Sequence, residues 1–113
     1  MSRPLRGEVW MTDLDPTRGH EQAGKRPALV VSADAFNQGP ADLVIVLPVT
    51  TKRRGVRSHV PVEAPEGGLR KPSFIKCEDV RSVALERLTR RLGTVSGATM
   101  EAVQFRLRIL MDL

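Results

Sequence analysis

The apolar residues of this 113-residue chain occur in short runs separated by glycine and proline, and only the C-terminal segment departs from this pattern. Such runs, rich in strand-forming residues and closed by turn residues, indicate β-strands. The predicted strands are residues 8–14, 28–31, 43–47, 58–63 and 74–77, followed by one or two more within 79–95. Strands at this spacing favour a small antiparallel β-barrel. Nothing marks a boundary within residues 1–113, which we take as a single domain.

The C-terminal segment changes to a helical period. Ser96 can cap a helix through its side-chain oxygen, and Gly97 and Ala98 open it. Apolar residues then recur at helical spacing, namely Met100, Val103, Leu107 and Leu110. Phe105 and Ile109 widen the apolar arc, so we expect the barrel or a partner to cover much of this helix. The predicted fold class is therefore mainly β (α+β), a small barrel with a C-terminal α-helix.

The charge of the chain points to a polyanionic partner. The chain has 18 Lys and Arg against 13 Asp and Glu, a formal net charge of +5 and a pI of about 10.3. Of the basic residues, 14 are Arg. A guanidinium binds phosphate through two parallel hydrogen bonds and stacks on bases. Nucleic acid is therefore the leading class of partner, and a basic surface that only keeps the protein soluble is the alternative.

Composition argues against several other classes. No apolar run approaches the roughly 20 residues that span a bilayer, and the N-terminus lacks the apolar stretch of a signal peptide. The single cysteine, Cys77, excludes an internal disulfide and a Cys-rich zinc site. His20 and His59 are far apart in the sequence, and no glycine-rich phosphate loop follows a strand. We expect a cytoplasmic protein without membrane contact that needs neither a metal nor a cofactor.

Residues 15–26 form the most informative segment, because long loops without large apolar side chains are more often functional than not. This predicted loop ends at Lys25 and Arg26, so the Arg26 guanidinium is presented where the chain enters a buried strand. The alternative is a structural ion pair of Arg26 with Glu21 or Asp15.

Other side chains suggest chemistry less specifically. His20 is suited to acid–base work near neutral pH, although a lone loop histidine is more often only solvated. Thr50 ends a buried strand and could donate its hydroxyl to an oxyanion, but threonine is common at strand ends. Cys77 is expected to point inward as a core thiol, with Lys76 and Glu78 on the other face of the strand.

Several motifs, taken together, resemble one known family. They are Arg6-Gly-Glu-Val-Trp10, Leu14-Asp-Pro-Thr17, Gly19-His-Glu-Gln-Ala-Gly-Lys-Arg-Pro27, Pro48-Val-Thr-Thr51 and Phe74-Ile-Lys-Cys-Glu-Asp-Val-Arg81. This pattern is similar to the MazF/PemK (Kid) family of toxin endoribonucleases over nearly the whole chain. The resemblance implies an SH3-like barrel of the CcdB/MazF type with a C-terminal helix, and a homodimer. It also implies cleavage of single-stranded RNA at a short sequence, and silencing by a cognate antitoxin.

The same resemblance implies the site residues. In MazF-like members the Arg of the Arg-Pro pair and the Thr that ends the third strand are catalytic, which gives Arg26 and Thr50. In the Kid-like branch a His before Glu-Gln, and an Arg and an Asp flanking a cysteine, do the acid–base work. These positions are His20, Lys76 and Glu78 here, where Lys for Arg and Glu for Asp are departures from that branch.

The expected chemistry assigns a role to each group. Attack of a 2′-hydroxyl on the adjacent phosphate leaves a 2′,3′-cyclic phosphate and a 5′-hydroxyl, and it needs a base, an acid and stabilisation of negative charge. A guanidinium is a poor base, so we assign Arg26 to charge stabilisation and Thr50 to hydrogen bonding beside it. His20 is the better base or acid, and Glu78 is its partner or the base itself.

RNA is expected to contact the loops around this site. The predicted basic loop, residues 50–57, contains no acid. The residues expected to bind RNA are Glu21, Gln22, Lys25, Lys52, Arg53, Arg54, Arg57 and Lys76. We expect an antitoxin with an acidic binding segment to lie in the same groove and to compete with RNA.

Two alternatives come from other functional classes. CcdB toxins, which share the implied fold, poison DNA gyrase without catalysis, but they end in Trp-Gly-Ile, whereas this chain ends in Met111-Asp112-Leu113. The other alternative is an inactive RNA-binding barrel, and the joint presence of Arg26, Thr50 and His20 argues against it.

Overall fold

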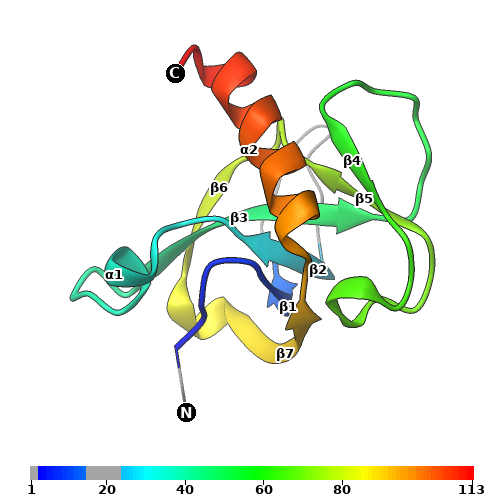
Figure 1. Cartoon of the computed structure of the whole chain (residues 1–113). Helices are drawn as coiled ribbons and strands as arrows, with labels where there is room; N and C mark the ends of the chain where they lie inside the picture. The colour runs from blue at the N-terminus through cyan, green and yellow to red at the C-terminus, as the bar shows by residue number, and fades with distance from the viewer. Residues whose placement is uncertain (1–2, 15–23) are drawn as a thin grey trace.

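The computed structural model describes residues 3–14 and 24–113 and shows a curved sheet with one long helix (Figure 1). The strands are β1 (Glu8–Asp13), β2 (Lys25–Val30), β3 (Leu43–Thr50), β4 (His59–Val62), β5 (Ser73–Lys76), β6 (Arg81–Ala84) and β7 (Leu88–Thr94). The helices are α1 (Asp34–Asn37), α2 (Gly97–Met111) and the short 3-10 helices η1 (Glu66–Gly68) and η2 (Leu85–Arg87).

Antiparallel pairing joins these strands in the order β4-β5-β3-β2-β1-β7, and β6 pairs with β3 outside this path. The long strand β3 organises the sheet, because it pairs with β2 along one edge and with β6 and then β5 along the other. The last residues of β3 therefore lie between the first residues of β2 and those of β5. This arrangement brings three strand ends together at one end of the sheet.

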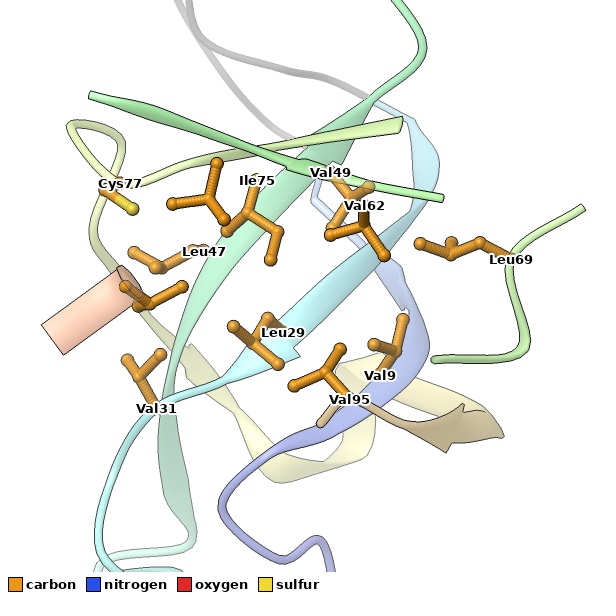
Figure 2. Close-up of a cluster of buried hydrophobic side chains, with 12 residues drawn as sticks. Val9, Leu29, Val31, Leu47, Val49, Val62, Leu69, Ile75, Cys77 and Val95 are labelled. Carbon is orange, nitrogen blue, oxygen red and sulfur yellow. The ribbon is translucent and has the colours of Figure 1, made fainter. Parts of the chain in front are cut away.

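Hydrophobic clusters cover both faces of the sheet, because successive side chains in a strand point to opposite faces. Val9 and Leu29 belong to the first cluster (Figure 2). Val103 of α2 is also part of this cluster. Trp10 and Ala28, their neighbours in sequence, belong to the second. The side chains of β1 and β2 therefore alternate between the two faces. The same alternation decides on which face the polar residues at the strand ends lie.

The structure confirms the predicted fold class, a mainly β, SH3-like barrel with a C-terminal helix. The Ser96 hydroxyl accepts a hydrogen bond from the Thr99 amide, as expected of a helix cap. Cys77 is fully buried, and burial raises the pKa of its thiol to about 11. Phe105 and Ile109 remain 63% and 65% exposed, so the barrel of one chain does not cover this side of α2.

Two predicted boundaries were wrong. Lys25 and Arg26 are the first residues of β2 and not the end of a loop, because they pair across the sheet with Asp13 and Thr12. Strand β3 does not end at residue 47 but continues through Pro48 to Thr50. Proline is tolerated there because Pro48 lies between the part of β3 that pairs with β6, up to Val46, and the part that pairs with β5, from Val49, so its missing N–H breaks neither ladder. In the described residues, no helix is long and apolar enough to cross a bilayer.

Candidate active site

The register of the sheet brings two candidate catalytic residues to the same face. In the β2–β3 ladder Ala28 is paired with Pro48. Arg26 and Thr50 lie two residues beyond this pair, at the neighbouring ends of the two strands. Residues two apart share a face, so both lie on the face of Ala28, which carries the second hydrophobic cluster.

The two side chains differ in exposure. Arg26 is exposed, whereas Thr50 is only 4% exposed. The Thr50 Oγ1 accepts a hydrogen bond from the Lys52 amide at 3.2 Å. A hydroxyl that accepts still has one proton to donate. This face therefore carries an exposed cation at the end of β2 and a nearly buried hydroxyl at the end of β3.

An aromatic ring lies beside Thr50, so that Arg26, Thr50 and Phe74 form a row across the ends of β2, β3 and β5, which we call the catalytic row. Thr50 is paired with Phe74 of β5, and the Arg53 guanidinium lies 5.2 Å from the centre of the Phe74 ring. This distance is typical of a cation–π contact. Arg53 belongs to the segment between β3 and β4, where Lys52, Arg54 and Arg57 are also exposed. The row at the sheet end is thus followed directly by a cluster of exposed cations.

Lys76 lies farther along β5 and is nearly buried, with its side chain only 10% exposed. Its Nζ lies 3.7 Å from Asp79 Oδ2, and Arg81 binds the Asp79 carboxylate with two hydrogen bonds of 2.8 and 2.9 Å. Arg81 also reaches the Leu14 carbonyl at 3.5 Å. Lys76 therefore belongs to an internal charge cluster rather than to the exposed cations.

Glu78 contacts the second histidine of the chain. Its carboxylate accepts a hydrogen bond from Ser58 Oγ at 2.6 Å and lies 2.9 Å from His59 Nε2. The His59 side chain is 4% exposed, and its Nδ1 has no hydrogen-bond partner among the described residues. Burial alone would raise the pKa of the Glu78 carboxyl, but hydrogen bonds from Ser58, from its own backbone and from His59 lower it below the usual value. Glu78 is therefore a firmly ionised carboxylate that ties β5 to β4.

Comparison with known proteins identifies the family. A model of the PemK-like, MazF-like toxins of type II toxin–antitoxin systems matches residues 5–111. The chain belongs to this family. Endoribonuclease MazF9 of Mycobacterium tuberculosis is 39% identical to it, with 96% of each chain covered. Endoribonuclease PemK of Escherichia coli is 36% identical, over 94% of this chain and 80% of that protein.

Solved structures of MazF proteins share the fold of this PemK/MazF-family chain. MazF from Deinococcus radiodurans superimposes with a TM-score of 0.88 at 28% identity, and both chains are covered completely. An endoribonuclease from a mycobacterial species, solved in complex with its cognate antitoxin, gives a TM-score of 0.82 at 27% identity over 97% of this chain and 96% of that chain. The family predicted from the sequence motifs is confirmed.

The structure places only some of the predicted site residues of this family member. His20, Glu21 and Gln22 lie outside the described residues. Arg26 and Thr50 lie on one face of the sheet, and Glu78 pairs with His59, which is opposite Lys76 in the β4–β5 ladder. In residues 3–14 and 24–113, no group of three His, Cys, Asp or Glu side chains is placed to hold a metal ion.

Sequence reasoning missed the contacts of His59, Asp79 and Phe74. The alternation of His59 with Val60 indicates that His59 faces away from the first cluster, but no pattern in the sequence reveals Glu78 as its partner. The spacing of Asp79 from Lys76 and Arg81 was a visible signal for a local ion pair. Phe74 was recognisable as a strand residue, yet only the β3–β5 register shows that it lies beside Thr50.

Proposed function

We propose that this PemK/MazF-family chain is an endoribonuclease that cuts single-stranded RNA, messenger RNA included, without a metal ion. The 2′-hydroxyl attacks the adjacent phosphorus, the bond to the 5′-oxygen of the next nucleotide breaks, and the products carry a 2′,3′-cyclic phosphate and a 5′-hydroxyl. The observation that carries this proposal is the placement of Arg26 and Thr50 on one face of the sheet, next to the exposed cations of residues 52–57. Cleavage of messenger RNA would inhibit translation in the cytoplasm, where we place the protein.

Arg26 and Thr50 are suited to stabilising the negative charge that develops on the phosphate during cleavage. Negative charge grows on the phosphate oxygens as the new bond forms, and donors fixed in advance stabilise it without reorganising. A guanidinium offers several N–H donors but does not readily give up its proton, so Arg26 does not serve as the base. The Thr50 hydroxyl, held by the Lys52 amide, adds a second donor.

Proton transfer then needs another group, and we assign it to His20. An imidazole both accepts and returns a proton near neutral pH, so one histidine can serve the 2′-hydroxyl or the leaving oxygen. Glu78 suits this task less well, because hydrogen bonds from Ser58 and His59 occupy its two oxygens and lower its pKa. We therefore assign Glu78 a structural role.

We assign RNA binding to the exposed cations that lie next to the catalytic row. Arg53 and Phe74 are in contact, and each offers a planar group on which a base can stack. Aromatic rings and guanidinium groups are the usual stacking partners of single-stranded RNA. Lys25, Lys52, Arg54 and Arg57 then supply phosphate contacts. Glu21 and Gln22 are assigned to the same surface on the family motif alone.

Assembly as a homodimer is supported by the uncovered side of α2. Phe105 and Ile109 are exposed, and with Leu110 and Val56 they line a groove of about 660 Å³ between α2 and the β3–β4 segment. Exposed apolar surface of this kind marks interfaces, and two-fold dimers are the commonest closed assembly. We further propose control by an antitoxin with an acidic binding segment that competes with RNA for the exposed cations, because opposite charge steers and stabilises such a complex.

The decisive experiment is cleavage in excess EDTA with chemical mapping of the product ends. We expect activity to persist, with 2′,3′-cyclic phosphate and 5′-hydroxyl ends. Products with 5′-phosphate ends, or activity abolished by chelation, would contradict the proposed chemistry. His20→Ala tests the acid–base assignment separately, because it should remove activity together with the acidic limb of the pH–rate profile.

A further inference from the structure

The reverse face of the same sheet end carries a second cleft, of about 320 Å³. Met11 is paired with Pro27 on one side and with Arg90 on the other, which makes a row across β2, β1 and β7. The cleft is lined by Met11, Pro27, Thr51, Gly68, Leu69, Arg70, Lys71, Ser73, Arg90 and Leu92. Three of these residues are the immediate sequence neighbours of Arg26, Thr50 and Phe74. Because successive residues of a strand face opposite ways, the cleft lies back to back with the candidate active site.

The cleft combines an apolar floor with a cationic rim. Met11, Pro27 and Leu92 supply the floor. Arg70, Lys71 and Arg90 are exposed, and no ion pair joins any of them to an acid among the described residues. None of the described lining residues is acidic. An anion that enters this cleft would therefore meet cations that are already free to bind it.

The turn that precedes Arg70 and Lys71 has little conformational freedom. Leu69 is buried in the first cluster. Gly68 has a φ of +73°, and a Cβ added there would lie 2.0 Å from the Leu92 carbonyl oxygen, so only glycine lets the turn approach β7 this closely. The Glu66 carboxylate accepts hydrogen bonds from the Ser96 amide and the Thr99 hydroxyl. Arg70 and Lys71 thus start from an anchored backbone, which lowers the ordering cost of binding.

We propose that this cleft is a subsite for one nucleotide of the bound RNA, flanking the cleaved bond. The base lies against Met11, Pro27 and Leu92, and the phosphate is held by Arg70, Lys71 and Arg90. The proposal rests on the proposed endoribonuclease function. RNA is favoured over an acidic peptide because the cleft combines an apolar floor with exposed cations that can bind phosphate, and because two of its lining residues, Pro27 and Thr51, directly follow Arg26 and Thr50 in the sequence.

The test compares the double variant Arg70→Ala/Lys71→Ala with Arg108→Ala, which removes an exposed cation from α2 instead. The probe is an RNA that carries the sequence cut by the wild type, made resistant by a 2′-deoxy sugar at the cleaved position. We expect the double variant to weaken binding about tenfold and to flatten the salt dependence by about 0.7 in slope for each phosphate that is no longer neutralised. For cleavable RNA we expect KM to rise with kcat unchanged. Arg108→Ala should change none of these values.

Shortening the RNA locates the subsite along the strand. Removing flanking nucleotides one at a time should weaken wild-type binding at one step and leave the double variant unaffected at that same step. If both proteins respond equally to every truncation and share one salt slope, the subsite is refuted while RNA cleavage by the wild type still stands. If the double variant binds RNA normally but loses an acidic antitoxin peptide, the cleft belongs to the peptide and the inference is overturned. A wild type that cuts no RNA refutes the proposed function, and the subsite with it, because the subsite rests on that function.

Discussion

Two groups of polar residues in this molecule, each with a member that the family motifs mark as catalytic, differ in the folded chain. At one end of the sheet, Arg26 is exposed and lies on the same face as Thr50, beside exposed cations. Farther along the sheet, Glu78 and His59 bind each other, and the His59 side chain is almost completely buried. The first group combines an exposed guanidinium with a nearly buried hydroxyl, whereas in the second a carboxylate and a histidine bind each other within the protein.

The difference teaches that the partners of a residue decide its role more than its type does. A histidine and a carboxylate at hydrogen-bond distance are a common catalytic pair, yet here the pair joins β4 to the end of β5. A threonine and an arginine at strand ends are ordinary residues, yet the sheet places Arg26 and Thr50 on one face, where we propose that they stabilise a phosphate. Substitutions in the two groups should therefore have opposite consequences for activity and stability.

The largest effect is expected from Arg26→Ala. Loss of one donor to a developing oxyanion typically costs about 10²–10³ in rate, so kcat should fall by that factor while the melting temperature stays near the wild-type value. Thr50→Ala should lower kcat in the same way, and Arg108→Ala serves as the charge-matched control. An Arg26→Ala variant with near-normal kcat would place the chemistry elsewhere.

A smaller effect is expected from Phe74→Leu, which removes the ring beside Thr50 but keeps an apolar side chain. Stacking of a base on an aromatic ring contributes about 1–3 kcal/mol, so RNA should bind at least about fivefold more weakly, with kcat at saturation little changed. Phe36→Leu, at a residue of α1 that is 39% exposed, is the matched control. Equal binding by the two variants would show that no base stacks on Phe74.

The smallest effect on catalysis is expected from Glu78→Gln. The substitution weakens the hydrogen bonds to Ser58 and His59, so the free energy of unfolding should fall by about 0.5–1.5 kcal/mol, the usual net contribution of a hydrogen bond. Cleavage should remain within about threefold of the wild type, with Glu86→Gln as the control for removal of a negative charge. A loss of activity as large as that of Arg26→Ala would make Glu78 part of the chemistry and erase the difference between the two groups.

The pH dependence of stability tests whether Glu78 has the structural role that we assign to it. The pKa of Glu78 in the folded chain lies below its ordinary value of 4.5. The contribution of Glu78 to the free energy of unfolding is therefore fully present above pH 4.5 and is lost as the pH falls through the lower pKa of the folded chain. The pKa of Glu66 is lowered likewise, through the Thr99 hydrogen bond and the Ser96 amide. Urea unfolding below pH 4.5 should therefore show a shallower loss of stability for Glu78→Gln than for the wild type. Identical slopes would mean that Glu78 has no stabilising partner.

Much of the fold was predictable because it depends on local pattern. The apolar runs indicated the strands, and Ser96 with the spacing from Met100 to Leu110 indicated the helix. The boundary at Lys25 was missed because two basic residues and a glycine carry no strand signal of their own. They join β2 only because β1 offers Thr12 and Asp13 as partners across the ladder, and such pairing is a long-range property.

The sequence by itself determined the family, the mainly β architecture and the cationic character of the surface, because motifs, hydrophobic period and charge are all properties of the chain as written. Only the tertiary structure decided which polar residues meet. It placed Arg26 on the same face as Thr50 and Phe74, paired Glu78 with His59, and gathered Arg70, Lys71 and Arg90 around one cleft. The physical reason is that strand register and the close approach of Gly68 to β7 are fixed by packing between segments far apart in sequence, and a shift of one residue would turn every one of these side chains to the other face.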